Sequence, residues 1–176
     1  MTEEKLAKKA IRGNMHAYGE LIHLYQNELY RIAFMHTKNE QDALDIVSDA
    51  IAKGYEHVHK LREPAYFKTW LIRVLLNTVH DFFRKQQKTT DWELLENVPL
   101  DAPAHIGLEE KMDLYNAIDS LPEKYKSIIV LKYYNELKIS EISDILCMPE
   151  GTIKANLHHA KQALKNYLKE DYLYES

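Results

Sequence analysis

The sequence predicts an all-α protein made of two small helical domains, which are joined by a flexible acidic linker. Three observations support this prediction. Apolar residues recur at three- and four-residue steps, glycine and proline number only five each, and one central segment carries acids without bases. At 176 residues, 45% of them hydrophobic, the chain can bury two helical cores.

Charge divides the chain into segments 1–88, 89–108 and 109–176. The first has 14 Lys and Arg against 11 Asp and Glu, the second has four acids and no base, and the third has nine Lys against 12 acids. The middle segment also contains two prolines and a glycine and keeps no helical period. We therefore interpret residues 89–108 as an extended connection between the two domains.

Three helices are expected in the first domain. An apolar face recurs from Leu21 to Ala33, a second helix follows within Gln41–His59, and a third spans about Ala65–Lys88. Pro64 suits the first turn of this third helix and disfavours helix immediately before it.

The second domain is expected to contain helices near Leu108–Ser120, Glu123–Asn135, Ser140–Leu146 and Gly151–Leu168. The last two are short apolar-faced helices joined by a tight turn that contains Cys147. This pattern predicts a helix-turn-helix, whose second helix can enter the major groove of DNA.

Two polar stripes are candidates for DNA contact. Four residues face outward from the last helix: Lys154, His158, Lys161 and Lys165. Four others share one side of the third helix: Arg73, Asn77, His80 and Arg84. Such side chains can contact phosphates and, for an asparagine, a base edge. An ordinary solvated helix face is the alternative for both stripes.

An acidic stripe lines the outer face of the second helix, at Asp42, Asp45 and Asp49. Acids in a DNA-binding protein do not face phosphates, so this stripe suggests a basic protein partner. Its spacing alone, however, favours simple solvation.

Several classes of function are disfavoured by what the sequence lacks. A single cysteine excludes an internal disulfide, and no residues have the spacing of a metal site or a cofactor-binding loop. His57 and His59 point in different directions on a helix, so they do not indicate an enzyme. The chain shows no signal peptide and no membrane-spanning run, which predicts a cytoplasmic protein with no direct membrane insertion.

Three segments, in this order along the chain, resemble the extracytoplasmic-function sigma factors, which are small sigma subunits of bacterial RNA polymerase. The polymerase-binding helix of that family is similar to DALDIVSDA (42–50), and its promoter-melting helix to FKTWLIRVLLNTVHDFFRK (67–85). Its helix-turn-helix domain is similar to SLPEKYKSIIVLKYYNELKISEISDIL (120–146) and PEGTIKANLHHAK (149–161).

The resemblance implies a sigma factor that directs core polymerase to promoters and is not an enzyme. It assigns contact with the basic coiled coil of the largest polymerase subunit to Asp42, Asp45, Ser48 and Asp49. It assigns the minus-ten element to Lys60, Leu61, Arg62, Glu63, Thr69, Arg73, Asn77, Arg84 and Lys85. It assigns the minus-thirty-five element to Thr152, Lys154, Asn156, His158, His159 and Lys161.

The resemblance also implies an inhibitor, an anti-sigma factor of a class often anchored in the membrane. We expect it to wedge between residues 1–88 and 109–176 and to use the apolar positions around Phe67–Phe83. Linker residues are expected to add apolar contacts: Trp92, Leu94, Leu95 and Ile106.

The sequence departs from the family pattern at four positions. Ser48 replaces a usual Gln, Cys147 replaces a usual Gly in the turn, and Asn156 and His159 replace usual arginines. A non-glycine residue at positive φ is uncommon, so the turn is expected to differ locally. The alternative function is a stand-alone helix-turn-helix regulator, which would bind operator DNA without polymerase, usually as a dimer on a palindrome.

Overall fold

The computed structural model describes residues 2–93 and 109–174, with side chains for 2–86 and 114–167. These residues form helices and turns and no strand, which confirms the predicted all-α class. In chain order the elements are α1 (Glu3–Ile11), α2 (Met15–Thr37), α3 (Glu40–His57), η1 (Val58–Lys60), η2 (Pro64–Tyr66), α4 (Phe67–Glu93), α5 (Glu109–Asp119), α6 (Glu123–Ile129), η3 (Val130–Tyr134), α7 (Ile139–Leu146) and α8 (Glu150–Tyr174).

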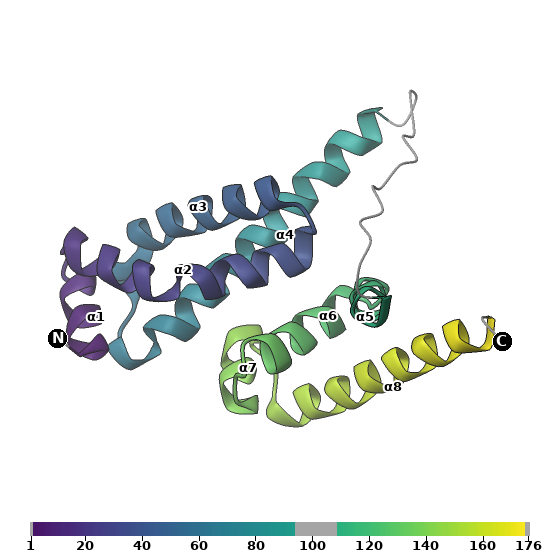
Figure 1. The fold of residues 1–176 in the computed structure, drawn as a ribbon. Coiled ribbons are helices and arrows are strands. Elements are labelled where there is room, and N and C mark those ends of the chain that lie inside the picture. Colours follow the sequence, from purple (N-terminus) through teal and green to yellow (C-terminus); the bar gives the residue numbers. More distant parts are fainter. Residues whose placement is uncertain (1, 94–108, 175–176) are drawn as a thin grey trace.

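Helices α1 to α4 form the first bundle (Figure 1). Two asparagines start its helices: Asn14 Oδ1 accepts from Ala17 N at 2.8 Å, and Asn39 Oδ1 accepts from Asp42 N at 2.9 Å. The short helix α1, which is not among the predicted elements, packs on α2 and on the turns η1 and η2. It therefore supports the connection that precedes α4.

Helices α2, α3 and α4 approach one another closely at Gly54, which is buried. The Tyr18 hydroxyl donates to the Ile51 carbonyl at 2.8 Å, and burial raises the pKa of this phenol, so it remains a donor. A Cβ at Gly54 would lie 2.4 Å from the Tyr18 hydroxyl and 3.4 Å from Leu71 Cδ1. Glycine is needed here for space.

Replacing Gly54 by alanine should lower the free energy of unfolding by up to about 2 kcal/mol, because displacing a hydrogen-bonded hydroxyl costs about 1–3 kcal/mol and alanine regains about 1 kcal/mol over glycine inside α3. Gly19→Ala is the matched control, since Gly19 lies within α2 and nothing lies within 4 Å of its Cβ position. Alanine is favoured over glycine inside a helix by about 1 kcal/mol, so Gly19→Ala should be neutral or stabilising. Urea unfolding measures both variants, and an unchanged midpoint for Gly54→Ala would contradict the expectation.

Helices α5 to α8 form the second bundle, and α7 and α8 make the predicted helix-turn-helix. Cys147 ends α7 in the left-handed conformation, with φ 54° and ψ 42°. The turn is closed by Ser143, whose hydroxyl donates to the Met148 carbonyl at 2.5 Å and whose carbonyl accepts from Met148 N at 3.2 Å. The chain thus adopts the left-handed turn without glycine, at the usual energetic cost for a residue with a Cβ.

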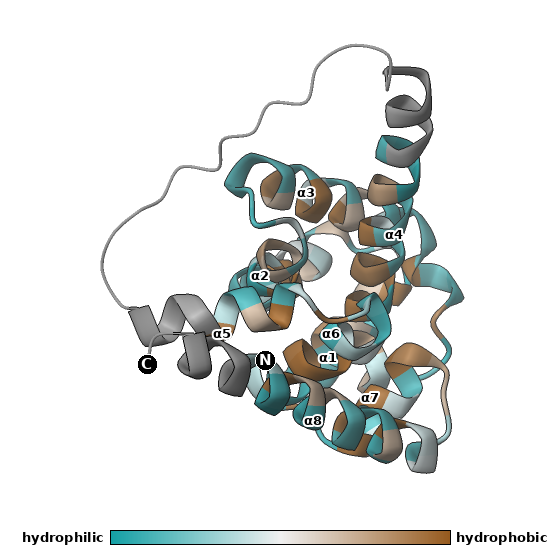
Figure 2. Cartoon of the chain, turned by 90° about the vertical axis from the view of Figure 1, so that its right-hand side faces the viewer, coloured by the Kyte–Doolittle hydropathy of each residue, from teal (hydrophilic) through white to brown (hydrophobic). Residues whose placement is uncertain are grey.

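The two bundles pack directly against each other. Contacts join α4 to α7 and α2 to η3, and buried apolar side chains from both bundles form one cluster. In Figure 2 the hydrophobic colour lies mainly where helices face other helices, while the outer sides are hydrophilic. Two helical domains are present as predicted, but their described parts share an interface.

Two expectations are corrected by this arrangement. Residues 89–93 are helical rather than extended, because no proline or glycine interrupts the chain between Pro64 and Pro99 and α4 continues to Glu93. Phe67 is only 1% exposed, since it packs inside its own bundle, so it offers no surface to an inhibitor. The remaining linker residues, 94–108, lie outside the described residues, as does the side chain of Trp92.

Candidate nucleic-acid and protein interfaces

The acidic residues of α3 lie on its solvent side. Asp45, Ser48 and Asp49 are exposed, and Asp42 is half-buried near the helix N-terminus. The Asp45 carboxylate accepts from Gln41 Nε2 at 3.0 Å, which is a bond between exposed side chains of the same helix. We name Asp42, Asp45, Ser48 and Asp49 the acidic face.

Two neighbours of the acidic face are missed by the sequence analysis. Leu44 is 46% exposed, although leucines in amphipathic helices usually face the core. Glu56, also exposed, continues the acidic face two turns after Asp49. Their positions outside the apolar period of α3 were the available signal. An acidic surface with an exposed leucine suits a basic partner that also offers an apolar contact.

The loop before α4 is held by its apolar residues and displays its polar ones. Val58 is buried and Leu61 half-buried, whereas Lys60, Arg62 and Glu63 are exposed. Leu61 N donates to the Val58 carbonyl at 3.0 Å, which closes the turn η1. The apolar residues and this hydrogen bond therefore hold the loop in place, while its charged side chains are exposed to solvent.

A pocket of about 290 Å³ lies between this loop and the start of α4. It is lined by Leu61, Tyr66, Thr69, Trp70, Arg73 and Asp144. Five of these residues come from the first bundle, and three of them are predicted minus-ten residues. Aromatic faces and a guanidinium are the groups that stack on nucleic-acid bases and attract phosphates.

The predicted minus-ten residues of α4 differ in accessibility. Thr69 and Arg73 are half-buried, whereas Asn77, Arg84 and Lys85 are exposed. The Arg73 guanidinium donates to the Asp144 carbonyl of the second bundle, and Arg84 pairs with Asp81 at 2.8 Å on its own helix. The later residues of this set, Asn77, Arg84 and Lys85, are therefore exposed, whereas Arg73 is in contact with α7.

The predicted minus-thirty-five residues lie on two flanks of α8. Each helical residue turns by about 100°, which places Lys154, His158 and Lys161 on one flank and groups the others on the opposite flank: Thr152, Asn156 and His159. Asn156 is half-buried and the other five are exposed. Ile153, Leu157 and Ala160 are buried between the flanks, which fixes the orientation of the helix.

Three exposed positions of this domain were not predicted. Ala155 and Gln162 lie on the outward side of α8 between the two flanks, where they would be nearest to a DNA groove. Tyr133 of η3 is 49% exposed, and the Lys161 ammonium lies 5.4 Å from its ring centroid. Small or uncharged side chains carry little sequence signal, which explains why the first two are missed.

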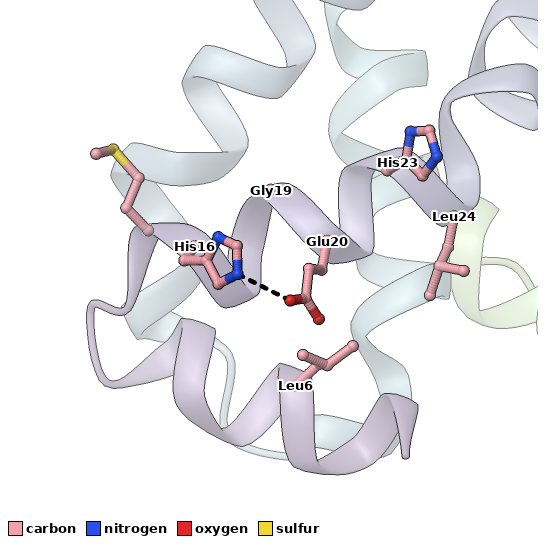
Figure 3. A pocket seen from close by; sticks show the side chains of 7 residues that line it. Leu6, His16, Gly19, Glu20, His23 and Leu24 are labelled. Atoms are coloured by element: carbon pink, nitrogen blue, oxygen red, sulfur yellow. Dashed lines mark ion pairs between the residues drawn. The ribbon is translucent and has the colours of Figure 1, made fainter. Parts of the chain in front are cut away.

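A separate groove of about 770 Å³ opens between α1 and α2 (Figure 3). It is lined by Leu6, Met15, His16, Gly19, Glu20, His23 and Leu24. The His16 and Glu20 side chains approach to 3.0 Å along its rim. No pattern in the sequence predicts this groove, and none of its residues belongs to a predicted site.

Comparison with known proteins identifies the family. Residues 21–89 match sigma-70 region 2, and residues 111–164 match sigma-70 region 4. The RNA polymerase sigma factor SigV of Bacillus subtilis is 37% identical over 150 residues, which cover 84% of this chain and 89% of SigV. The ECF RNA polymerase sigma factor SigW of the same organism is 28% identical over 97% of this chain and 98% of SigW.

This chain belongs to the extracytoplasmic-function sigma factors. It is a transcription initiation factor that binds core RNA polymerase and promoter DNA, and it is not an enzyme. The family membership also disfavours the stand-alone regulator.

Two solved structures have the same fold: CnrH in complex with the cytosolic domain of CnrY, and RpoE in complex with the anti-sigma factor NepR from Bartonella quintana. The CnrH structure has a TM-score of 0.75 and 21% sequence identity, and the match covers 96% of this chain and 98% of CnrH. The RpoE structure has a TM-score of 0.72 and 21% sequence identity, and the match covers 86% of this chain and 96% of RpoE.

Within the described residues of the sigma factor, no helix is long and apolar enough to cross a membrane. In the same residues no three His, Cys, Asp or Glu side chains are grouped as metal ligands.

The two flanks of α8 should differ in what they contribute to promoter binding. Lys154→Ala with Lys161→Ala should weaken binding about equally on all promoters and reduce the salt slope by about 2, if each lysine contacts one phosphate as predicted. Asn156→Ala should instead relax the preference at one base pair, at a cost of about 1–3 kcal/mol. Binding of the polymerase complex to a promoter library at several salt concentrations measures both. A lysine variant that changes base preference and keeps the salt slope would contradict this division.

Proposed function

We propose that this sigma factor uses three separate surfaces to bind core polymerase, the minus-ten element and the minus-thirty-five element. The acidic face of α3 binds the basic coiled coil of the largest polymerase subunit. The loop at residues 60–63 and the polar side of α4 hold the melted minus-ten strand. The exposed flanks of α8 contact the minus-thirty-five element.

The observation that carries this proposal is the pocket beside the loop. A base that leaves the duplex loses stacking worth a few kcal/mol, so its binding site must return that free energy. Trp70 and Tyr66, a residue that is 54% exposed, offer aromatic rings beside the guanidinium of Arg73. This combination supports capture of one non-template base, with Asn77 and Arg84 following the strand along α4.

In vitro transcription with core polymerase is the direct test. The sigma factor added to core should switch on a defined set of start sites that core alone does not use. Tyr66→Ala should reduce open-complex formation at those sites, while duplex binding through α8 is kept. If the chain produced no new start sites, or if Tyr66→Ala impaired both steps equally, the assignment would be wrong.

The proposal includes an anti-sigma factor, anchored in the membrane, that controls the sigma factor in the cytoplasm, where the polymerase works. Of the structural relatives described above, RpoE was solved in complex with the anti-sigma factor NepR, and CnrH in complex with the cytosolic domain of CnrY. An inhibitor helix placed between the two bundles, as expected from the sequence, would have to displace the contact of Arg73 with Asp144. Cross-linking of the chain to its co-purifying inhibitor should therefore yield contacts on both α4 and α7. Contacts confined to the outer tip of one bundle, with core binding unimpaired, would refute this placement.

A further inference from the structure

Charged side chains join the two bundles at the end of α2. The His36 side chain is completely enclosed, and its Nδ1 lies 2.5 Å from Glu123 Oε1 at the start of α6. Beside this pair, the Lys38 ammonium lies 3.9 Å from Asp119 Oδ1 and 4.9 Å from the centroid of the Tyr115 ring. The first bundle thus contributes two basic side chains, and the second bundle contributes the acids and the ring that receive them.

The electrostatics of Glu123 support a charged contact. Burial alone would raise the pKa of this carboxyl group. The contact with His36, together with the charges of His36, Lys126 and His80, outweighs burial and holds the pKa of Glu123 below its usual value. The carboxylate therefore stays ionised at the edge of the interface. The His36 side chain is completely enclosed whereas that of Glu123 is 47% exposed, so loss of the Glu123 carboxylate would leave the enclosed imidazole without its partner, which disfavours the contact.

A second contact lies where the two bundles meet on α4. The Arg73 guanidinium donates to the Asp144 carbonyl of α7, and Asp144 forms one wall of the pocket that also contains Thr69. Figure 1 shows the second bundle lying along the first, with α7 closest to the early part of α4. The side of the pocket that the second bundle forms thus carries the acidic residue Asp144, which would repel a phosphate backbone.

The two contacts affect the proposed binding surfaces unequally. Arg73 is bound to the second bundle through the Asp144 carbonyl and Thr69 shares a pocket with Asp144, whereas Asp45 and Asp49 of the acidic face remain exposed. In this arrangement the acidic face of α3 stays accessible, whereas a DNA strand that followed α4 would meet the acidic Asp144 beside Thr69 and Arg73.

We propose that the contact between the bundles is an autoinhibitory latch, in which His36–Glu123 and Lys38–Asp119 hold α7 over the strand-binding side of α4. This inference rests on the proposed minus-ten role of α4. Any ligand that binds the covered side must first separate the bundles, so its apparent affinity is reduced by the fraction of chains that are closed. Breaking the latch should therefore increase strand binding by the sigma factor alone.

The test uses the full chain with Glu123→Lys, which replaces the carboxylate by an ammonium group beside His36 and Lys126. Glu136→Lys is the matched control, because it changes the same charge at an exposed position of the same bundle. His36→Gln breaks the latch from the first bundle and serves as a second variant should Glu123→Lys fold poorly. Spin labels at Asn27→Cys and Asn166→Cys, in a Cys147→Ser chain, report the distance between the bundles.

Pulsed electron resonance should show a longer and broader distance for the latch variants and an unchanged one for the control. Anisotropy with a dye-labelled non-template strand from a mapped promoter should show at least about a fivefold gain in affinity, the lower end of typical coupling between sites. An unchanged distance would overturn the latch, and separation without a gain in strand binding would overturn its inhibitory role. Asn77→Ala in the opened chain tests the proposed function separately, because Asn77 is exposed and belongs to the proposed strand-binding side of α4. Strand binding that did not depend on Asn77 would contradict the minus-ten assignment. The distance between the spin labels would still test the latch in that case.

Discussion

Replacing Asp45 and Asp49 together by arginine should abolish association with core polymerase while leaving the fold intact. Both carboxylates are exposed on α3, so their reversal turns attraction for a basic coiled coil into repulsion. Like charges placed opposite each other at an interface cost several kcal/mol, and about 3 kcal/mol corresponds to a loss of roughly a hundredfold in affinity. Exposed substitutions of this kind usually change the free energy of unfolding by less than about 0.5 kcal/mol.

Co-purification with core polymerase, followed by titration of a labelled sigma factor, measures this loss. Glu4→Arg with Glu136→Arg is the matched control, because it makes the same change in net charge at exposed positions away from α3. The control should bind core like the wild type. Normal core binding by the Asp45→Arg, Asp49→Arg variant, with an unchanged helical circular dichroism spectrum, would show that the acidic face is not the polymerase contact.

The sigma factor alone should bind duplex promoter DNA poorly and become specific only with core polymerase. Residues 109–176 carry nine Lys and 12 acids, so the phosphate attraction that drives independent DNA binding is weak in the domain that holds the helix-turn-helix. At physiological salt we expect a Kd no tighter than about 10⁻⁶ M, the usual range of unspecific binding. With core, binding should tighten by at least about a thousandfold at the correct promoter.

Gel-shift titration at fixed salt, with and without core polymerase, measures this difference. A scrambled promoter duplex is the control for specificity. Tight and sequence-specific binding by the isolated chain would instead support a stand-alone regulator, and sedimentation would then test whether the chain dimerises on a palindrome, as that class usually does.

Much of the local structure could be predicted from the sequence because its causes are local. In α3, Ala43, Ile46 and Ala50 recur at helical spacing and are all buried, so the outward position of the acidic residues follows from periodicity alone. The helix-turn-helix is predicted in the same way by Ile142 and Ile153, both completely buried. The continuation of α4 to Glu93 also has a local cause, because no proline or glycine lies between Pro64 and Pro99, whereas acidic composition does not by itself end a helix.

Contacts between distant residues were beyond such reasoning. The sequence by itself determined the helices, the two domains, the family and the charge of each candidate surface, because side-chain period and motif order are properties of short segments. Only the tertiary structure decided which surfaces are accessible. His36 meets Glu123, and Arg73 meets Asp144, across separate bundles. No residue pattern encodes these pairs, since they depend on how two complete bundles pack, and that packing covers part of α4 while it leaves the acidic face of α3 exposed.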